Sequence, residues 1–222
     1  GVTKEETPEV YDTFMEYTTK AYASEKSPLE LSFIPIHPGD ILSYGGYHFE
    51  VKLLKGHTFG QCGLYEPEKK LMFVGDQLMT TIVPIVGTQE TDLGMLKCYL
   101  DSLGDLKHNY KDCYFLPCHY GEIRNVEKEV NRIILGYLEK CEIMKHVLEE
   151  AGTVLTTRDI GVRTYGRSQG PPDYAHFASC TYIWAKTFSC MEYMMGEGFV
   201  ERSERDGIIY WKAPSIHFEN NR

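Results

Sequence analysis

The chain has 222 residues, of which 42% are apolar and 13% aromatic, enough to bury one sizeable core or two modest ones. It carries 23 basic and 32 acidic residues, and the net charge of −9 argues against nucleic acid and anionic membranes as partners. No apolar run approaches the roughly 20 residues of a membrane-spanning helix, and we find no secretory signal. The seven cysteines are scattered without a C-x-x-C pair, which is typical of free thiols. We therefore expect a soluble cytoplasmic protein.

The first half of the sequence predicts a helix and then a series of short strands. Residues 7–23 repeat apolar side chains at helical spacing after a threonine and a proline that suit a helix start. Further along the chain we predict strands at 41–44, 47–54, 63–65, 71–74 and 113–116. A helix that opens at Thr91 or Asp92 precedes the last of these strands. This order predicts a mixed α/β fold in which strands dominate.

The second half predicts helices and a hairpin. Residues 125–150 carry one apolar stripe with charged residues on the remaining surface, the clearest helical pattern in the chain. Helices at 157–165 and 179–195 follow, and then strands at 199–202 and 208–212 joined by an Asp-Gly turn. Two helices followed by a hairpin are typical of a winged-helix unit. We expect three parts: a first domain over 1–124, a connecting helix over 125–150 and a winged-helix-like domain over 151–222.

Three candidate metal ligands lie at the ends of predicted strands. They are His57 in G-H-T-F-G, Asp76 in F-V-G-D and His119 in L-P-C-H. Because strand ends can converge on one edge of a sheet, and glycines permit tight turns beside two of these residues, a common cleft is expected. A carboxylate with two imidazoles suits zinc, with iron or manganese as alternatives. The competing interpretation is structural: Asp76 as a turn residue that binds its own backbone, and His119 as an ordinary strand-end histidine.

The order of these motifs, from about Asp40 to Gly121, resembles the second half of the metallo-β-lactamase superfamily, as in glyoxalase II and its relatives. The resemblance implies a partial αββα sandwich over residues 1–124. It also implies that His57 binds one zinc ion, that Asp76 bridges two and is the catalytic candidate, and that His119 binds the second. The implied activity is metal-dependent hydrolysis of an ester, thioester or similar bond in a small-molecule substrate.

The chain departs from this family in one important motif. H-x-H-x-D-H does not occur, because no two of the eight histidines are two residues apart. Each metal would keep two protein ligands, where a catalytic zinc usually has three. We therefore expect a truncated chain with weak or absent metal binding, active as a hydrolase only in a longer form. Apolar sheet surface left uncovered by the truncation predicts a homo-oligomer or a partner chain.

Two other functions remain open from the sequence. The chain could be a non-catalytic fragment that binds a partner or has a structural role. It could also be a winged-helix regulator that binds DNA, but the helix predicted at 179–195 offers Lys186 as its one base among mostly apolar residues. A helix that reads a DNA groove needs several Arg, Lys, Asn or Gln side chains. We therefore expect no nucleic-acid partner.

Overall fold

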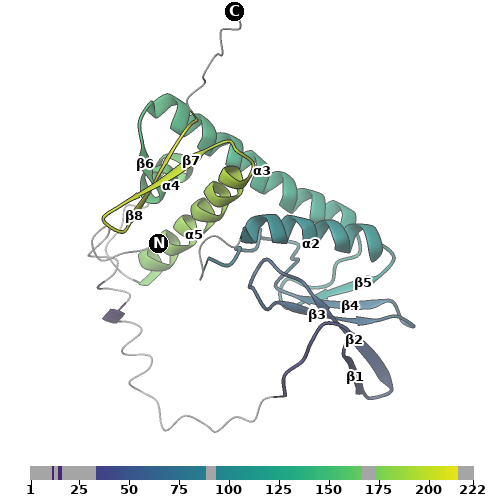
Figure 1. Ribbon diagram of the computed structural model, residues 1–222. Helices are drawn as coiled ribbons and strands as arrows, with labels where there is room; N and C mark the ends of the chain where they lie inside the picture. Colours follow the sequence, from purple (N-terminus) through teal and green to yellow (C-terminus); the bar gives the residue numbers. More distant parts are fainter. Residues whose placement is uncertain (1–11, 13–14, 17–33, 89–93, 167–173, 215–222) are drawn as a thin grey trace, which may run out of the picture. The chain divides into compact units, whose positions relative to one another are not determined.

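The computed structural model describes residues 12, 15–16, 34–88, 94–166 and 174–214 (Figure 1), without the side chains of 174–180. Most of the helix predicted at 7–23 lies outside these residues. The chain divides into two compact units, residues 20–138 and a second made of 1–19 and 139–222. The division falls inside a helix, and the three-part domain organisation expected from the sequence stays a prediction.

The first unit contains a five-stranded sheet in the order β1-β2-β3-β4-β5. Strands β1 to β4 form an antiparallel meander, and β5 pairs in parallel with β4. A parallel pair needs a crossover connection, and α2 lies in that crossover. All five strands lie within one or two residues of their predicted positions. Their bounds are β1 Ile41–Tyr44, β2 Tyr47–Leu53, β3 Cys62–Glu66, β4 Leu71–Gly75 and β5 Tyr114–Pro117.

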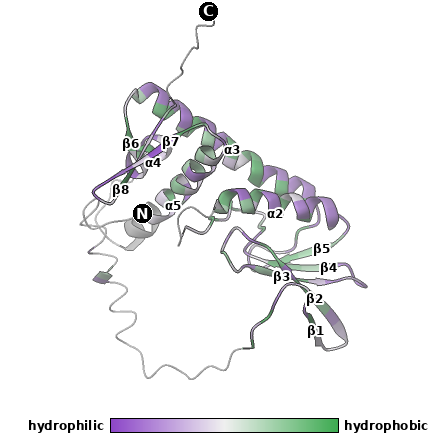
Figure 2. Cartoon of the chain, in the orientation of Figure 1, coloured by the Kyte–Doolittle hydropathy of each residue, from purple (hydrophilic) through white to green (hydrophobic). Residues whose placement is uncertain are grey.

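Helix α2 (Met95–Asn109) begins later than predicted. The predicted start at Thr91 or Asp92 lies outside the described residues, and within them Gly94 precedes the first helical residue in a left-handed conformation with φ 58°. Glycine adopts this conformation without the steric penalty that a side chain brings. Five apolar side chains at helical spacing form the buried side of the helix, and Figure 2 shows apolar and polar residues mixed along it. They are Met95, Leu96, Tyr99, Leu103 and Leu106.

The two faces of the sheet differ in burial. Met72 is fully buried, and its neighbour in the sheet, Tyr65, contacts Tyr110 at the end of α2 with ring centroids 5.0 Å apart. Helix α2 therefore covers this face. The opposite face is also apolar, and its burial is uneven, because Phe73 in its centre is 39% exposed whereas Val51 is fully buried. Side chains on that face come from Leu42, Phe49, Val51, Leu64, Phe73 and Leu116, which stand opposite one another across the strands.

The second unit contains the end of α3 (Val126–Ala151), then β6 (Leu155–Thr156), α4 (Thr157–Tyr165), α5 (Tyr174–Gly196), β7 (Glu201–Arg205) and β8 (Ile208–Lys212). Its strands form a sheet in the order β6-β8-β7. Asp206 and Gly207 have φ of 52° and 76°, as the predicted hairpin turn requires. The sequence missed β6 and placed the start of α5 five residues too late. The winged-helix assignment stays a prediction.

A tryptophan lies at the centre of this second unit. Trp211 is fully buried, its Nε1 donates to Thr157 Oγ1 at 2.9 Å, and its ring packs edge-to-face on Phe188.

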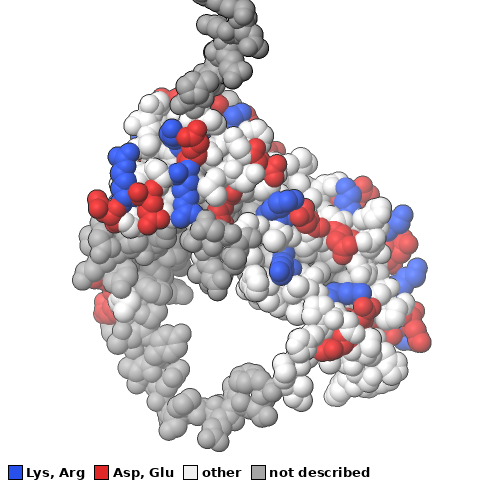
Figure 3. All heavy atoms as spheres, viewed as in Figure 1, with Lys and Arg blue, Asp and Glu red and all other residues white. Residues whose placement is uncertain are grey.

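Among the described helices, none has the length and apolar character needed to cross a bilayer. On the face shown in Figure 3, basic and acidic side chains lie intermixed. Ion pairs between exposed side chains include Lys97–Asp101 at 3.2 Å. The cytoplasmic location stays a prediction.

Candidate metal centre

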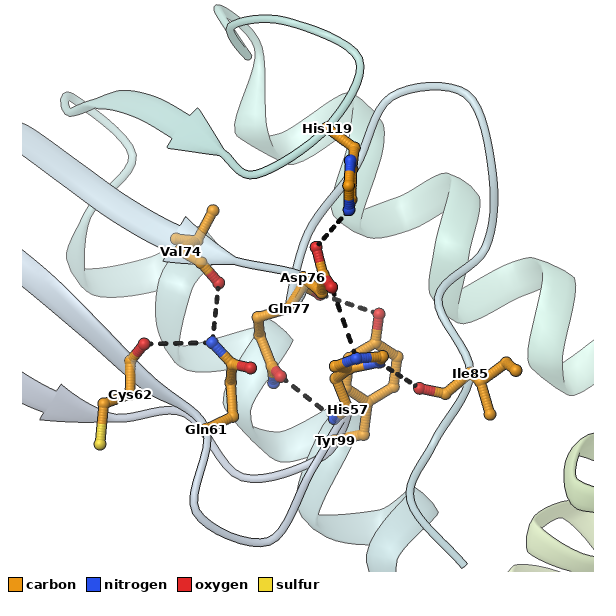
Figure 4. A network of polar contacts seen from close by, with 9 residues as sticks. All are labelled: His57, Gln61, Cys62, Val74, Asp76, Gln77, Ile85, Tyr99 and His119. Atoms are coloured by element: carbon orange, nitrogen blue, oxygen red, sulfur yellow. Dashed lines mark hydrogen bonds and ion pairs between the residues drawn. The ribbon is translucent and has the colours of Figure 1, made fainter. Parts of the chain in front are cut away.

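The sheet brings the three predicted ligands together at one edge. His57 lies in the turn after β2, Asp76 directly follows β4, and His119 follows β5. Strands β2 and β4 are both antiparallel to β3, and β5 is parallel to β4, so the carboxyl ends of β2, β4 and β5 point the same way. The predicted convergence of His57, Asp76 and His119 is what the structure shows (Figure 4).

Asp76 lies between the two imidazoles. Its Oδ2 is 3.6 Å from His57 Nε2, and its Oδ1 is 3.5 Å from His119 Nε2. Both separations are too long for hydrogen bonds. Zinc holds nitrogen and oxygen ligands at about 2.0–2.2 Å in a tetrahedron, which places neighbouring ligand atoms about 3.3 Å apart. The measured separations therefore fit pairs of ligands to a shared cation better than direct hydrogen bonds.

One oxygen of the Asp76 carboxylate is buried. Among the residues that the structure describes, this oxygen, Oδ1, has no hydrogen-bond partner. Burying an unpaired carboxylate oxygen costs free energy, and a protein usually compensates with a donor or a cation. The environment of Asp76 therefore indicates that a positively charged group belongs beside this oxygen.

The orientation of His57 is set by a main-chain carbonyl. Its Nδ1 lies 2.9 Å from the oxygen of Ile85, which can only accept, so Nδ1 carries the proton. In the neutral ring, His57 Nε2 then presents a lone pair toward Asp76. Two hydrogen-bond acceptors, His57 Nε2 and Asp76 Oδ2, therefore face each other with no proton between them. A carbonyl bonded to the far nitrogen is a common arrangement for a metal-binding histidine. This hydrogen bond therefore prepares His57 Nε2 to bind a cation.

The segment that contains Ile85 is anchored by α3. The hydroxyl of Tyr137 donates to the carbonyl of Pro84 at 2.6 Å, and Arg132 Nη2 donates to the carbonyl of Met79 at 2.7 Å. The same segment reaches the other histidine, because Thr80 Oγ1 donates to the carbonyl of Tyr120 at 3.2 Å. One connection after β4 therefore contacts the surroundings of both imidazoles.

His119 is the most exposed of the three ligands, with 60% of its side chain accessible compared with 27% for His57 and 29% for Asp76. The chain reverses directly after it, because Tyr120 and Gly121 have φ of 67° and 77°. A hydrogen bond from the Tyr114 hydroxyl to Glu122 holds the returning segment and lowers the pKa of that carboxyl group. His119 therefore lies on a held but solvent-facing turn.

The turn before His57 has no space for a side chain. Gly56 packs against Tyr99, and a Cβ atom added to this glycine would lie 2.2 Å from Tyr99 Cδ2. The backbone N–H of Gly87 donates to the Gly56 carbonyl at 2.9 Å. The glycine is therefore required by close packing as well as by backbone conformation.

The donor set matches half of a two-metal site. His57 and His119 face different oxygens of Asp76, so each of the two metal positions would have two protein ligands. Within the ranges that the structure describes, no three His, Cys, Asp or Glu side chains surround one point. A catalytic zinc ion normally has three protein ligands. The three residues fit a bridged metal pair in type and placement, and they leave each ion short of ligands.

The sequence analysis missed the residues that hold these ligands in place. Gln77, Tyr99 and the carbonyl of Ile85 all bind the His57 or Asp76 segments through hydrogen bonds. The position of Gln77 directly after Asp76 was the one available signal in the sequence. A main-chain carbonyl such as that of Ile85 leaves no sequence signal, because every residue has one.

Comparison with solved structures identifies the fold. No family model matches the chain. The structure is similar to a metallo-β-lactamase family protein from Thermus thermophilus, with a TM-score of 0.68 and 20% identity over 95% of this chain and 67% of that one. It is also similar to a β-lactamase domain protein from Burkholderia ambifaria, with a TM-score of 0.76 and 18% identity over 93% of this chain. The chain has a metallo-β-lactamase-like fold.

A sequence match supports a more specific relation. Over 40 residues, 18% of this chain, the metallo-β-lactamase-like protein is 50% identical to hydroxyacylglutathione hydrolase GloC from Haemophilus influenzae. The match supports a relation to glyoxalase II-like proteins. It covers 19% of the Haemophilus protein, and the chain spans 58% of the Burkholderia protein. The predicted resemblance to the metallo-β-lactamase superfamily is confirmed for the fold.

Proposed function

We propose that this chain contributes His57, Asp76 and His119 to a two-metal centre of a metal-dependent hydrolase, with Asp76 as the bridging residue. The observation that carries the proposal is the position of the Asp76 carboxylate. Each of its oxygens faces a different imidazole Nε2, at 3.6 and 3.5 Å, and one oxygen is buried without a hydrogen bond from any described residue. A structural turn aspartate would instead bind backbone N–H groups.

Each of the three side chains has its own part in this proposal. Asp76 would neutralise charge between the two ions, and His57, fixed by the Ile85 carbonyl, would bind through Nε2. His119 would bind from the exposed side, where a substrate can approach. Zinc suits this donor set, with iron or manganese as alternatives. When bound, such ions lower the pKa of water to about 7 and polarise a carbonyl or phosphoryl oxygen, which suits hydrolysis of an ester, thioester or similar bond in a small molecule.

The ligand count favours a second possibility, a non-catalytic chain with a structural or partner-binding role. Two protein ligands per ion give weak binding, and the sequence contains no H-x-H-x-D-H motif to add more. Hydrolysis would need further ligands from outside these three residues. The predicted truncation stays a prediction. Metal binding is the property that separates the two functions.

The test is zinc binding by the purified 222-residue chain. After dialysis in metal-free buffer we expect little metal by inductively coupled plasma mass spectrometry, because two ligands do not retain an ion. Calorimetric titration with zinc chloride should still show saturable binding that a His57→Ala, His119→Ala double variant lacks. Equal titration curves for the wild type and the double variant would contradict the proposed metal centre and leave the non-catalytic role.

We also propose that a second copy of the chain covers the sheet face centred on Phe73. Phe73 is 39% exposed, whereas Met72 beside it on the other face is fully buried. Phe49 packs edge-to-face on Phe73 and continues the apolar surface. In a two-fold dimer the same surface of each copy meets the other, so pairing of two copies can bury an exposed apolar face.

Sedimentation over a range of concentrations tests this self-association. Phe73→Glu should raise the dissociation constant of the dimer about tenfold or more, because it places a charge in the centre of the apolar contact. Leu135→Glu is the matched control, since Leu135 is 57% exposed and lies on α3 rather than on the sheet. A wild-type chain that stays monomeric at every concentration would show that this proposal is wrong.

Nucleic acid remains an unsuitable partner. The chain has a net charge of −9, and the hairpin formed by β7 and β8 pairs Lys212 with Glu201 at 2.8 Å. Lys186 on α5 is half-buried, and burial lowers the pKa of its amine. These features support the absence of a DNA-binding function, because a DNA-reading surface offers exposed basic groups to phosphates.

A further inference from the structure

Gln77 connects the two ligand segments at the buried side of the site. It directly follows Asp76, and its side chain is fully buried. Its Oε1 accepts from the backbone N–H of His57 at 3.3 Å (Figure 4). Its Nε2 donates to the carbonyl of Lys55 at 3.1 Å and to the hydroxyl of Ser102 at 3.0 Å. One amide therefore joins the end of β4, the turn after β2, and helix α2.

The backbone of Gln77 is fixed as well. Its N–H donates to the carbonyl of Val74 at 3.1 Å, and its carbonyl accepts from the hydroxyl of Tyr99 at 2.9 Å. Tyr99 also packs directly on Gly56, in the turn that leads to His57. The backbone of Gln77 is therefore held in place by hydrogen bonds that do not involve its side chain.

The amide binds the His57 turn on both sides of its glycine. Its oxygen binds the N–H of His57, and its nitrogen binds the carbonyl of Lys55, so the residues flanking Gly56 are both held. Glycine allows many backbone conformations, and these two bonds select one of them. An amide that merely filled buried space would not need to bind residues on each side of this turn.

We infer that Gln77 is a positioning residue that fixes the direction of the His57 imidazole relative to Asp76, and thereby the affinity of the pair for a divalent metal. The part of this inference that concerns metal affinity rests on the proposed function. The part that concerns the imidazole does not, because it rests on the hydrogen bonds that Gln77 makes to the His57 turn and on the one between His57 Nδ1 and the Ile85 carbonyl.

The test replaces Gln77 with methionine, which has a similar length and no hydrogen-bonding amide. In calorimetric titration of the full chain with zinc chloride, the apparent dissociation constant should rise about 10- to 100-fold, the usual effect of removing a group that orients a metal ligand. In metal-free protein at mildly alkaline pH, long-range nitrogen–proton spectra should show His57 protonated at Nδ1 in the wild type. Gln77→Met should give a mixture of the two tautomers.

Gln61→Met is the matched control. Gln61 is a half-buried glutamine near the site, and its side-chain Nε2 donates to the carbonyls of Cys62 and Val74 instead of to the residues that flank Gly56 (Figure 4). It should leave both the tautomer and the zinc affinity unchanged. If Gln77→Met does not fold by circular dichroism, Gln77→Glu replaces it, since glutamate keeps the acceptor for His57 and loses the donor to Lys55.

Each outcome has a distinct meaning. A wild-type tautomer in the folded Gln77 variant would overturn the positioning role, and so would equal tautomer changes in the Gln77 and Gln61 variants. If the tautomer changes in the Gln77 variant alone while the wild type binds no zinc, the positioning role stands and the proposed metal centre is wrong. Changes in both tautomer and zinc affinity, confined to Gln77, are the expected result.

Discussion

Asp76→Asn is expected to abolish zinc binding and any hydrolytic activity, and at the same time to stabilise the metal-free chain by about 1 kcal/mol. Most substitutions in a folded protein destabilise it. The opposite sign is expected here because Asp76 Oδ1 is buried without a hydrogen bond in the described part of the chain, and Oδ2 faces the lone pair of His57 Nε2 at 3.6 Å. An asparagine amide removes the buried charge and can donate a hydrogen bond to that nitrogen.

The loss of zinc binding follows from the same geometry. Asp76 is the residue shared by both proposed positions, so without its charge each ion would keep one imidazole, where at least two protein ligands are needed for useful affinity. Calorimetric titration with zinc chloride and urea denaturation of the metal-free protein check the two effects. Asp101→Asn is the control, because Asp101 is exposed and pairs with Lys97 on α2.

Two results would contradict this interpretation of Asp76. Retention of wild-type zinc affinity by Asp76→Asn would show that the metal does not bind at this carboxylate. A loss of metal-free stability of about 1 kcal/mol or more would show that Asp76 serves the fold as a paired turn residue, which is the structural interpretation left open by the sequence.

Gly56→Ala is expected to destabilise the first unit by about 3 kcal/mol, because the new methyl group has no space. The added Cβ would lie 2.2 Å from Tyr99 Cδ2 and 2.6 Å from Tyr99 Cβ. The second atom is attached directly to the backbone of α2, so rotation of the tyrosine ring does not relieve the overlap. The turn that contains His57 must shift away from the helix instead.

Urea denaturation measures this loss, and Gly60→Ala is the control in the same loop. A Cβ on Gly60 would meet no atom within 4 Å, and its φ lies outside the left-handed region. We expect a change of less than about 0.5 kcal/mol there. Equal stabilities for the two alanine variants would mean that the contact between Gly56 and Tyr99 does not constrain the turn.

Local patterns were sufficient to predict most elements. The apolar stripe of α3 is buried from Val126 to Leu148, with Ile134 alone among the predicted members half-buried. The strands β1 to β5 agree with their alternating and apolar segments to within one or two residues. The errors lie at element ends, as with α5, which begins at Tyr174, five residues before its predicted start.

By itself, the sequence determined the mixed α/β fold and the three candidate ligands, because hydrophobic period and strand-end motifs are local properties. The tertiary structure decided how those ligands face one another. Gln77 binds residues 20 and more positions away, and the Ile85 carbonyl that orients His57 lies 28 residues after it in the chain. Which carbonyl or amide meets a given imidazole depends on how distant segments pack. The sequence therefore identifies the side chains that could bind a metal, and long-range packing orients the two imidazoles toward Asp76.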